Sequence, residues 1–377
     1  SDVQLARTVV HDNAYLGEGS RLAGAVVGRA CDLRRGVRAE EGVVLGDECF
    51  VGDDAVLSAG VKVYPFKTVE AEAIINTSIV WESRGARTLF GGVGVNGLAN
   101  IDVTPEFAAK VAMAFGTRIK KDSTVVTSRD SSRSARMLKR AMMAGLNAAG
   151  VNVLDLEVAS VPVTRFQAGR PSSAGGLTIR LAEDDPQSVE IRFFDGNGAD
   201  LADDDRRKVE RLFNREDFRR VLPSEIGDIG FPPRALEHYA VALEAIVDVG
   251  CIEEAAFKVV VDYGYGATSF AMTNVLSKLG AEVLAVNPYV STAGVLAFDR
   301  AAHAEQVAGF VRTSGANLGL VMSPGGEELT LVGDQARVLD DTQDSLALLK
   351  MGAPDRAGGR VALPVSSSSR AGESVEG

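Results

Sequence analysis

The sequence is poor in the residues that build metal centres and disulfide networks. Its 377 residues include 3 cysteines, 3 histidines and 1 tryptophan. The cysteines are Cys31, Cys49 and Cys251, and the histidines are His11, His238 and His303. An odd number of cysteines without a C-x-x-C motif predicts reduced thiols in a cytoplasmic protein. The scatter of both residue types argues against a zinc site, which needs several ligands close together.

Long apolar runs and a basic surface are missing as well. No segment approaches the ~20 uncharged apolar residues that a membrane-spanning helix needs. Asp2, Arg7 and His11 interrupt any apolar core of a signal peptide. The formal net charge is −11, whereas binding to a nucleic-acid backbone needs a basic surface. We therefore expect neither a membrane nor a nucleic acid as a partner, while a local cluster of arginines would still suffice for a phosphorylated sugar.

An apolar residue recurs at every sixth position near the N-terminus. The series runs Val27, Leu33, Ala39, Leu45, Val51, Leu57, Val63, Val69 and Ile75. A helix cannot produce this period, because six is not a multiple of 3.6 residues per turn. Short strands and tight turns, with one inward apolar residue at each step, predict a triangular solenoid over residues 14–80.

This segment resembles the hexapeptide-repeat left-handed β-helix. Many enzymes with that fold transfer acyl groups and use a histidine base on the coils. Only His11 is near here, and it precedes the regular coils. We therefore expect the segment to assemble subunits into a homo-oligomer, with a hexapeptide acyltransferase as an alternative function.

Helices and strands alternate from residue 105 onward, which predicts mostly parallel sheets covered by helices. The first helix is expected at 105–115, with Thr104 as its N-cap and Pro105 at its first position. A second helix is expected near 133–149. A linker rich in Pro and Gly, at 222–233, divides this part into two α/β regions.

The order of short motifs along the α/β part is more informative than any one motif. The segments are Leu89-Phe90-Gly91, Ser128 to Arg133, Ala148 to Val153, Ile191 to Gly198, Gly280 to Val283 and Gly315 to Gly319. Their order and spacing resemble the phosphoglucomutase/phosphomannomutase family. The resulting fold class is mixed, a left-handed parallel β-helix followed by two α/β (αβα sandwich) phosphohexomutase-like domains. The predicted domains are 1–82, the β-helix; 83–222, domain I; 223–356, domain II; and 357–377, a truncated start of domain III.

The loops that carry the family's chemistry differ in this chain. The resemblance places Ala182 where the family has its phosphorylated serine, and Glu183 where it has the following histidine. Alanine has no oxygen to phosphorylate. We therefore predict no catalytic residue in this loop. Asn96 also stands where the family has an arginine.

The family's Mg²⁺ loop, with three carboxylates, corresponds to the run that contains Ser323, Gly325 and Glu327. Only Glu327 keeps a carboxylate there. A hard divalent cation needs several oxygen ligands. We therefore predict no metal in this loop.

Three arginines are the candidates for contacting a sugar phosphate, because guanidinium groups match phosphate oxygens. They are Arg129, Arg133 and Arg192. Ordinary surface charge is the alternative reading of each. Ser172, Ser173 and Thr178 offer hydroxyls near the altered loop. They precede the position at which the family's serine would lie, so they are on the wrong side of the loop to replace it.

A solenoid followed by a mutase-like module resembles the C-terminal part of actinobacterial-type mannose-1-phosphate guanylyltransferases, in which a nucleotidyltransferase domain comes first. We accordingly expect a non-catalytic assembly part of a sugar-nucleotide enzyme, with that domain in cis before Ser1 and no cofactor of its own. The alternative is a phosphomannomutase or phosphoglucomutase with a shifted nucleophile, and Mg²⁺ would be its cofactor.

Overall fold

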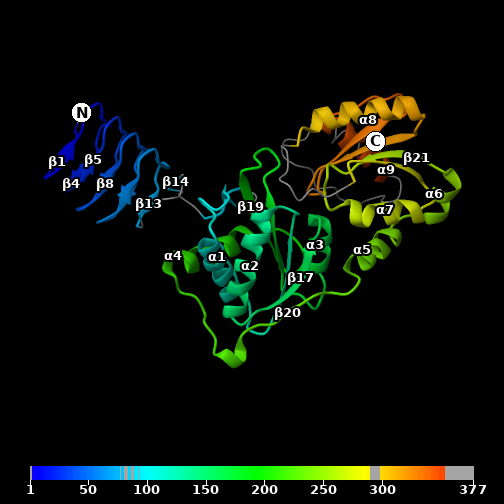
Figure 1. Ribbon diagram of the computed structural model, residues 1–377, viewed down its shortest axis with the longest axis horizontal. Coiled ribbons are helices and arrows are strands. Elements are labelled where there is room, and N and C mark those ends of the chain that lie inside the picture. Colours follow the sequence, from blue (N-terminus) through cyan, green and yellow to red (C-terminus); the bar gives the residue numbers. More distant parts are fainter. Residues whose placement is uncertain are drawn as a thin grey trace.

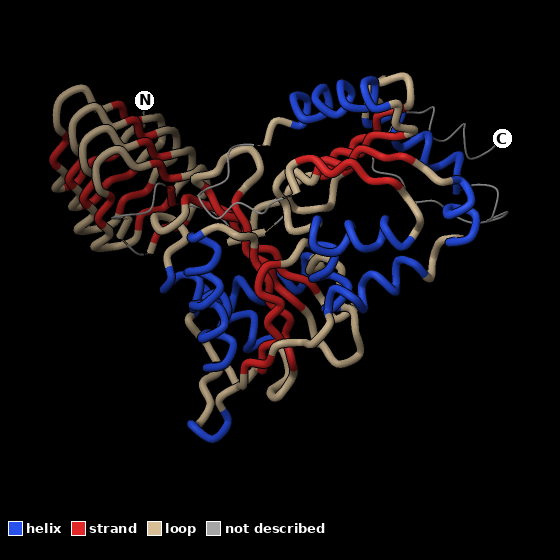
Figure 2. Tube along the Cα trace, turned by 45° about the vertical axis from the view of Figure 1, so that its right-hand side comes forward, coloured by secondary structure: helices blue, strands red, loops and turns tan. Residues whose placement is uncertain are grey.

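The computed structural model describes residues 2–76, 78–79, 84–85, 89–92, 94–288 and 298–352. Three parts follow one another along the chain (Figure 1). A part made of short strands (blue) lies to one side, a first α/β unit (cyan to green) lies in the middle, and a second α/β unit (yellow to orange) follows. The tube view shows the same succession from another side (Figure 2).

Very short strands build the N-terminal part. Successive strands enter three parallel sheets in turn, with the orders β1-β4-β7-β10-β13, β11-β8-β5-β2 and β14-β12-β9-β6-β3. Their bounds are β1 Gln4–Ala6, β2 Val9–Val10, β3 Tyr15–Leu16, β4 Arg21–Ala23, β5 Val26–Val27, β6 Asp32–Leu33, β7 Arg38–Ala39, β8 Val44–Leu45, β9 Phe50–Val51, β10 Val56–Leu57, β11 Lys62–Val63, β12 Thr68–Val69, β13 Ile74–Ile75 and β14 Arg84–Gly85. The apolar residues of the six-residue series, from Val27 to Ile75, are all buried between these sheets.

The prediction of a left-handed parallel β-helix as fold class was wrong. The described strands of this part form parallel sheets, but each strand has only two or three residues, and no distinct left-handed β-helix is evident. The six-residue period reports which side chains are buried. Burial alone determines neither the length of the strands nor the hand of their connections. The structure supports an α/β fold class with parallel sheets.

A six-stranded sheet with the order β15-β19-β18-β16-β17-β20 forms the first α/β unit. Its strands are β15 Val95–Leu98, β16 Thr124–Arg129, β17 Asn152–Val158, β18 Gly176–Leu181, β19 Ser188–Phe194 and β20 Ile229–Gly230. The central strands β16, β17 and β18 are parallel, whereas β19 pairs antiparallel with both β18 and β15. The antiparallel pairing folds β18 and β19 into a hairpin, which presents its loop at the carboxyl end of β18.

Helices cover both faces of this sheet (Figure 1). They are α1 Pro105–Arg118, α2 Arg133–Ala148, α3 Val161–Ala168 and α4 Asp203–Arg215. Helices α1, α2 and α4 pack on one face and share a core with Leu177 and Ile191, while α3 covers the other face against Phe194. The expected start of α1 is confirmed, since Thr104 accepts a hydrogen bond from the Phe107 backbone and Pro105 is the first helical residue.

The second α/β unit contains a four-stranded sheet with the order β22-β21-β23-β24. Its strands are β21 Lys258–Asp262, β22 Glu282–Val286, β23 Leu318–Met322 and β24 Leu329–Gly333. Its helices are α5 Ala235–Glu244, α6 Val249–Ala255, α7 Ser269–Lys278, α8 Arg300–Ser314 and α9 Asp341–Gly352, preceded by the 3₁₀ turn η1 Pro223–Glu225. Helix α8 packs on one face and α7 on the other.

The predicted boundaries at 82, 222 and 356 stay predictions. The expected start of a third domain, 357–377, lies outside the described residues. Within the part of the chain that the structure describes, no helix is long and apolar enough to cross a membrane.

Candidate functional site

The loop after β18 is held in place by Asp130, which follows β16. One carboxylate oxygen of Asp130 accepts a hydrogen bond from the Leu181 backbone N–H at 2.7 Å, and the other accepts one from Ser132 N–H at 2.8 Å. The Ser132 hydroxyl in turn caps α2. These bonds join the end of β18 to the start of α2 and fix Ala182 and Glu183 beyond the carboxyl edge of the sheet, where α/β proteins place their ligands.

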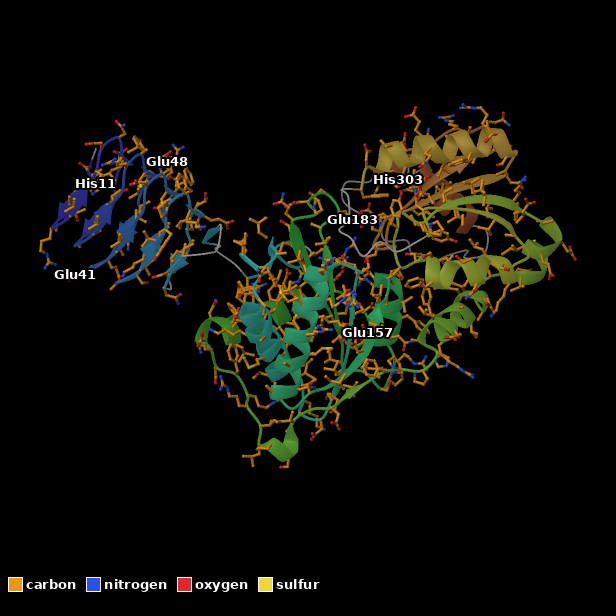
Figure 3. All side chains as sticks on the ribbon, in the orientation of Figure 1. His11, Glu41, Glu48, Glu157, Glu183 and His303 are labelled. Carbon is orange, nitrogen blue, oxygen red and sulfur yellow. The ribbon has the colours of Figure 1, made fainter. Side chains whose placement is uncertain are left out.

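A cavity of about 510 Å³ lies at this edge, where the two α/β units meet. Its lining comes from both units: Asn96, Arg180, Ala182, Glu183, Asp184, Asp185, Ser188, Glu190, Arg192, Ser323, Glu327 and Glu328. We call it the inter-unit cleft. Backbone bonds join its two sides, from Phe298 N–H to the Glu183 carbonyl and from Val161 N–H to the Gly325 carbonyl, both at 3.0 Å. Figure 3 shows Glu183 where the first unit faces the second.

Three arginines of the first unit surround Glu327 of the second unit. Arg165 lies on α3, Arg180 on β18 and Arg192 on β19. Their guanidinium groups contact the Glu327 carboxylate, Arg165 at 3.2 Å, Arg180 at 3.9 Å, and Arg192 by a direct hydrogen bond. We call these three residues the arginine cluster.

Further carboxylates pair with the cluster. Asp200 accepts from Arg165 at 2.8 Å and lies 3.2 Å from Arg192, while Glu183 binds Arg180 and also faces the Gly325 N–H at 3.4 Å. The cleft is therefore rich in charges of both signs, with the positive ones all supplied by the first unit.

The protonation of these groups follows from their surroundings. Burial opposes the charged form of Arg192, but Glu327 and Asp200 outweigh it and hold the pKa of Arg192 above its ordinary value. Burial alone would likewise raise the pKa of Asp200, yet its bonds with Arg165 and Arg192 lower it. Glu190 is the exception, because burial raises its pKa despite the nearby Arg180 and Arg192.

The loop expected to correspond to the Mg²⁺ loop does not fit that ion. Ser323 and Gly325 offer no carboxylate, and the carboxylate of Glu327 is engaged by the arginine cluster. Mg²⁺ takes six oxygen ligands and is usually bound through one or two free carboxylates. The remaining carboxylate of the loop, that of Glu328, pairs with Arg300. Among the described residues no cluster of three or more His, Cys, Asp or Glu side chains has the arrangement of a metal site.

Of the three predicted phosphate contacts, only Arg192 lines the inter-unit cleft. Arg129 is buried, donates to the Asp130 carbonyl at 2.8 Å and pairs with Glu157 at 3.2 Å. Arg133 is exposed at the first position of α2. Their role in phosphate binding stays a prediction, and the geometry places Arg129 and Arg133 outside the cleft.

The hydroxyls considered as substitutes for the missing serine lie away from the altered loop. Thr178 is buried and accepts from Ser128 at 2.8 Å, and Ser173 donates to the Gly175 carbonyl before β18. Ser188, on the other strand of the hairpin, is in a different position. Its backbone carbonyl accepts from Ala182 N–H at 3.0 Å, so Ser188 lies directly opposite Ala182. Its hydroxyl donates to Asp185 Oδ2 at 2.5 Å.

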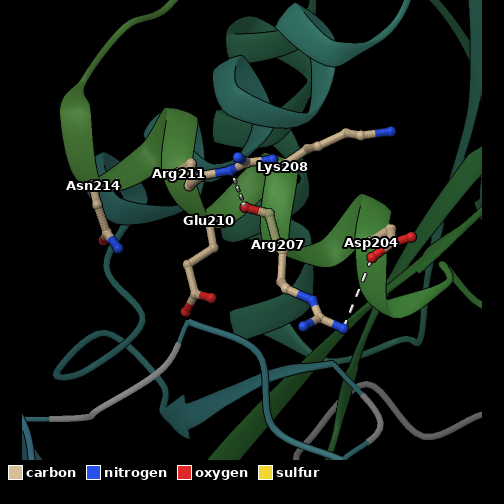
Figure 4. Close-up of a pocket in the computed structure, with 6 residues that line it drawn as sticks. All are labelled: Asp204, Arg207, Lys208, Glu210, Arg211 and Asn214. Carbon is tan, nitrogen blue, oxygen red and sulfur yellow. Dashed lines mark hydrogen bonds and ion pairs between the residues drawn. The ribbon is translucent and has the colours of Figure 1, made fainter.

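A second hollow of about 590 Å³ lies on the surface of α4 (Figure 4). All of its lining residues belong to that one helix: Asp204, Arg207, Lys208, Glu210, Arg211 and Asn214. Arg207 faces Asp204 at 3.8 Å, and Arg211 donates to the Arg207 carbonyl at 3.3 Å. Arg207 and Arg211 bond along the helix itself, whereas Glu210 accepts from the Leu89 backbone N–H. These polar groups do not converge on a common point, so the inter-unit cleft is the better candidate.

Comparisons with known proteins agree with this geometry. Residues 87–220 match the family model described as phosphoglucomutase/phosphomannomutase, alpha/beta/alpha domain I. A phosphoglucomutase/phosphomannomutase of Thermococcus kodakarensis is 36% identical over 205 residues, which is 53% of this chain and 45% of that protein. A phosphoglucosamine mutase of Bacillus subtilis is 29% identical over 258 residues, 67% of this chain and 57% of that protein.

Solved structures show the same fold. A phosphoglucomutase/phosphomannomutase family protein from Burkholderia thailandensis aligns with a TM-score of 0.60 at 19% identity, over 71% of this chain and 59% of its own. The first α/β unit is thus a phosphoglucomutase/phosphomannomutase domain I. The chain spans about half the length of the curated relatives it matches.

These relatives correct the predicted function. The expectation of a non-catalytic assembly part of a nucleotidyltransferase was wrong, because the relatives are named as phosphoglucomutases, phosphomannomutases and phosphoglucosamine mutases. The findings favour the alternative, a mutase. The resemblance to mannose-1-phosphate guanylyltransferases is not shown by any of them.

Several cleft residues were missed from the sequence. Arg165 of the arginine cluster gave no signal, and neither Ser188 nor Glu190 belongs to a motif that the sequence analysis singled out. Asn96 was noticed only as a departure from a family pattern. The alternation along β19 was available as a signal, since Ser188, Glu190 and Arg192 are spaced by two and therefore point to one face of a strand.

Proposed function

We propose that this protein is a phosphohexomutase-type enzyme that binds a hexose phosphate in the inter-unit cleft. The observation that carries the proposal is the meeting of two loops there. The loop after β18 belongs to a phosphoglucomutase/phosphomannomutase domain I, and the loop after β23 closes the cleft from the second unit. Arg192 and Arg180 supply positive charge to a site that is also lined by carboxylates, and both are suited to phosphate oxygens.

Ser188 is the phosphoryl acceptor in this proposal. Ala182 has no hydroxyl, and Ser188 faces it across the hairpin within the same cleft. The other hydroxyl in the lining, that of Ser323, is almost completely buried. The hydrogen bond from Ser188 lowers the pKa of Asp185, so this carboxylate is ionised at neutral pH and orients the hydroxyl. Because a lowered pKa makes the carboxylate a weak base, it takes the hydroxyl proton only as the Oγ–P bond forms.

The reaction proceeds in two halves. Ser188 Oγ attacks a phosphorus of a hexose bisphosphate, the Oγ–P bond forms, the P–O bond to the sugar breaks, and the serine proton passes through Asp185 to the departing sugar oxygen. In the second half the free hydroxyl of a hexose monophosphate attacks the phosphoserine, its proton goes to Asp185 and then to Ser188 Oγ, and the serine is regenerated.

No step is assigned to Mg²⁺, because the residues of the 323–328 loop do not fit it. We propose that the protein forms a homo-oligomer through its N-terminal sheets and works in the cytoplasm. The free thiols of Cys31, Cys49 and Cys251 support that location. The nucleotidyltransferase domain expected in cis stays a prediction.

Phosphopeptide mapping tests the acceptor. The chain is incubated with glucose 1,6-bisphosphate, digested and analysed by mass spectrometry. We expect one phosphoryl group on the peptide that contains Ser188, none in Ser188→Ala, and unchanged labelling in Ser173→Ala. Circular dichroism of each variant checks folding. Labelling at another residue would reassign the acceptor, and no labelling of the folded protein by either glucose or mannose bisphosphate would overturn the proposed chemistry.

A further inference from the structure

The arginine cluster is built as an anion site rather than as ordinary surface charge. Its members come from three different elements, α3, β18 and β19, and converge on one point. Arg180 is 6% exposed and Arg192 is 8% exposed. Buried like charges repel each other and lose hydration, so they persist only where an anion lies among them.

The cluster also contains a buried hydrogen-bond donor that has no acceptor. Within the described part of the chain, the Nε of Arg192 is buried without a hydrogen-bond partner. Arg165 is held over the ring of Phe194 at 4.5 Å and Arg192 lies 5.9 Å from the same ring, so one aromatic ring contacts both guanidinium groups. Their planes and donors are thus arranged before any ligand arrives, as an efficient anion site requires.

Asp200 and Glu183 of the first unit each pair with part of the cluster, but the carboxylate that contacts all three arginines comes from the second unit. Glu327 is placed by its loop, in which Gly326 N–H donates to the Ser323 carbonyl at 2.8 Å. The loop approaches Arg180 so closely that a Cβ on Gly325 would overlap its guanidinium group. A side chain at 325 would therefore require the guanidinium group of Arg180 to move from its present place near Glu327.

We infer that the arginine cluster is a phosphomonoester site that Glu327 occupies when no ligand is bound. The inference deepens the proposed function and rests on it only for the identity of the ligand as a hexose phosphate. A phosphomonoester carries a charge of about −1.5 to −2 at pH 7 and three acceptor oxygens, against one charge and two oxygens for a carboxylate. It therefore displaces Glu327, and the loop at 323–328 loses its ionic contact with the first unit.

Displacement has a quantitative consequence for affinity. A protein whose site is filled by its own side chain binds a ligand with an affinity reduced by the fraction of open sites. Removing the charge of Glu327 should therefore strengthen phosphate binding, on the order of tenfold if nine sites in ten are closed. Removing the charge of Glu327 should also lower the free energy of unfolding, because the buried arginines lose a counter-ion.

Calorimetric titration with inorganic phosphate and with glucose 6-phosphate tests the site. Three proteins are compared: the unaltered chain, Glu327→Gln, and Glu305→Gln as a control that removes the same charge from an exposed position on α8. We expect about tenfold tighter binding by Glu327→Gln, no change for Glu305→Gln, and loss of binding in Arg180→Met/Arg192→Met. Equal affinity of the unaltered chain and Glu327→Gln would overturn the inference.

Hydrogen exchange of the 323–328 amides tests the displacement without reference to activity. Saturating phosphate should speed exchange at Gly326 in the unaltered chain and leave Glu327→Gln unchanged. Binding without any change in this loop would contradict displacement. Ser188→Ala separates the two proposals: it should abolish phosphoryl labelling and leave phosphate affinity intact. Failure of labelling with normal displacement would reject the proposed chemistry alone.

Discussion

The ammonium group of Lys139 lies 2.5 and 2.7 Å from the two carboxylate oxygens of Asp155, and both side chains are buried. Lys139 belongs to α2 and Asp155 to β17, so the pair joins a helix to the sheet beneath it. The hydroxyl of Thr127 and the backbone N–H of Glu157 also donate to this carboxylate. Each charge is thus compensated in a place that water does not reach.

Breaking this pair from one side should destabilise the first unit strongly. Lys139→Met leaves a buried carboxylate without its counter-ion, and we expect a loss of about 3–5 kcal/mol in the free energy of unfolding. The double change Lys139→Met/Asp155→Leu should lose less, because no uncompensated charge remains. Urea denaturation followed by circular dichroism measures both. If Lys139→Met were as stable as the unaltered protein, the Lys139–Asp155 pair would not stabilise the first unit.

Glu190 and Asp200 should make stability depend on pH in opposite directions. The pKa of Glu190 is raised in the folded protein, so its contribution is fully present below its ordinary value of 4.5 and is lost as the pH rises through the raised value. Glu190→Gln keeps the side chain neutral and should therefore be more stable than the unaltered protein at pH 7. The difference should vanish near pH 4.

Asp200→Asn should behave in the reverse manner. The pKa of Asp200 is lowered by Arg165 and Arg192 against the effect of burial, so its contribution is present above its ordinary value of 3.8 and lost as the pH falls. We expect this variant to be less stable at pH 7, with the difference shrinking in acid. Thermal unfolding between pH 3.5 and 8 measures both carboxylates. If the stability differences of the two variants from the unaltered protein changed with pH in the same direction, the opposite pKa shifts of Glu190 and Asp200 would be contradicted.

Gly325→Ala should disturb the contact between the two α/β units. The added Cβ would fall on the guanidinium group of Arg180, which must then leave Glu183 and Glu327. We expect a cost of about 1–3 kcal/mol, the usual range for an overpacked site. Gly333→Ala is the matched control in the same unit, because the nearest atom to its Cβ lies 4.0 Å away. Calorimetric unfolding of both variants distinguishes a local clash from a general effect of the methyl group.

Gly28→Ala should disturb the packing between neighbouring strand connections in the N-terminal sheets. Its Cβ would lie 2.6 Å from the carbonyl carbon of Gly46 in the neighbouring strand connection, where only backbone is available to move. We expect a loss of about 1–3 kcal/mol, seen as faster hydrogen exchange across residues 2–76. Gly92→Ala, whose Cβ would meet no atom within 4 Å, should leave exchange there unchanged. Unaltered protection in Gly28→Ala would mean that the strands separate readily.

Local patterns in the sequence were enough to predict the α/β part. Helix α1 begins where Thr104 and Pro105 indicated, because a cap and a proline act within one turn of the chain. The resemblance to the phosphoglucomutase/phosphomannomutase family was confirmed over residues 87–220, since short motifs in a fixed order can be recognised along the chain. The six-residue period likewise identified the buried residues of the N-terminal part, while the fold class drawn from it was wrong.

The inter-unit cleft, by contrast, depends on tertiary structure. Arg165, Arg180, Arg192 and Glu327 come from four different segments and share no motif. Arg192 was a candidate for contacting a phosphate, but no local pattern joins it to the other three. Their contacts arise because antiparallel β18 and β19 bring two arginines to one face, α3 brings the third, and the second unit places Glu327 among them. The sequence by itself determined which segments become strands and helices and which family signature they carry. Only the packing of the two units decided which charges meet, because burial and distance set the strength of an ion pair and neither is encoded locally.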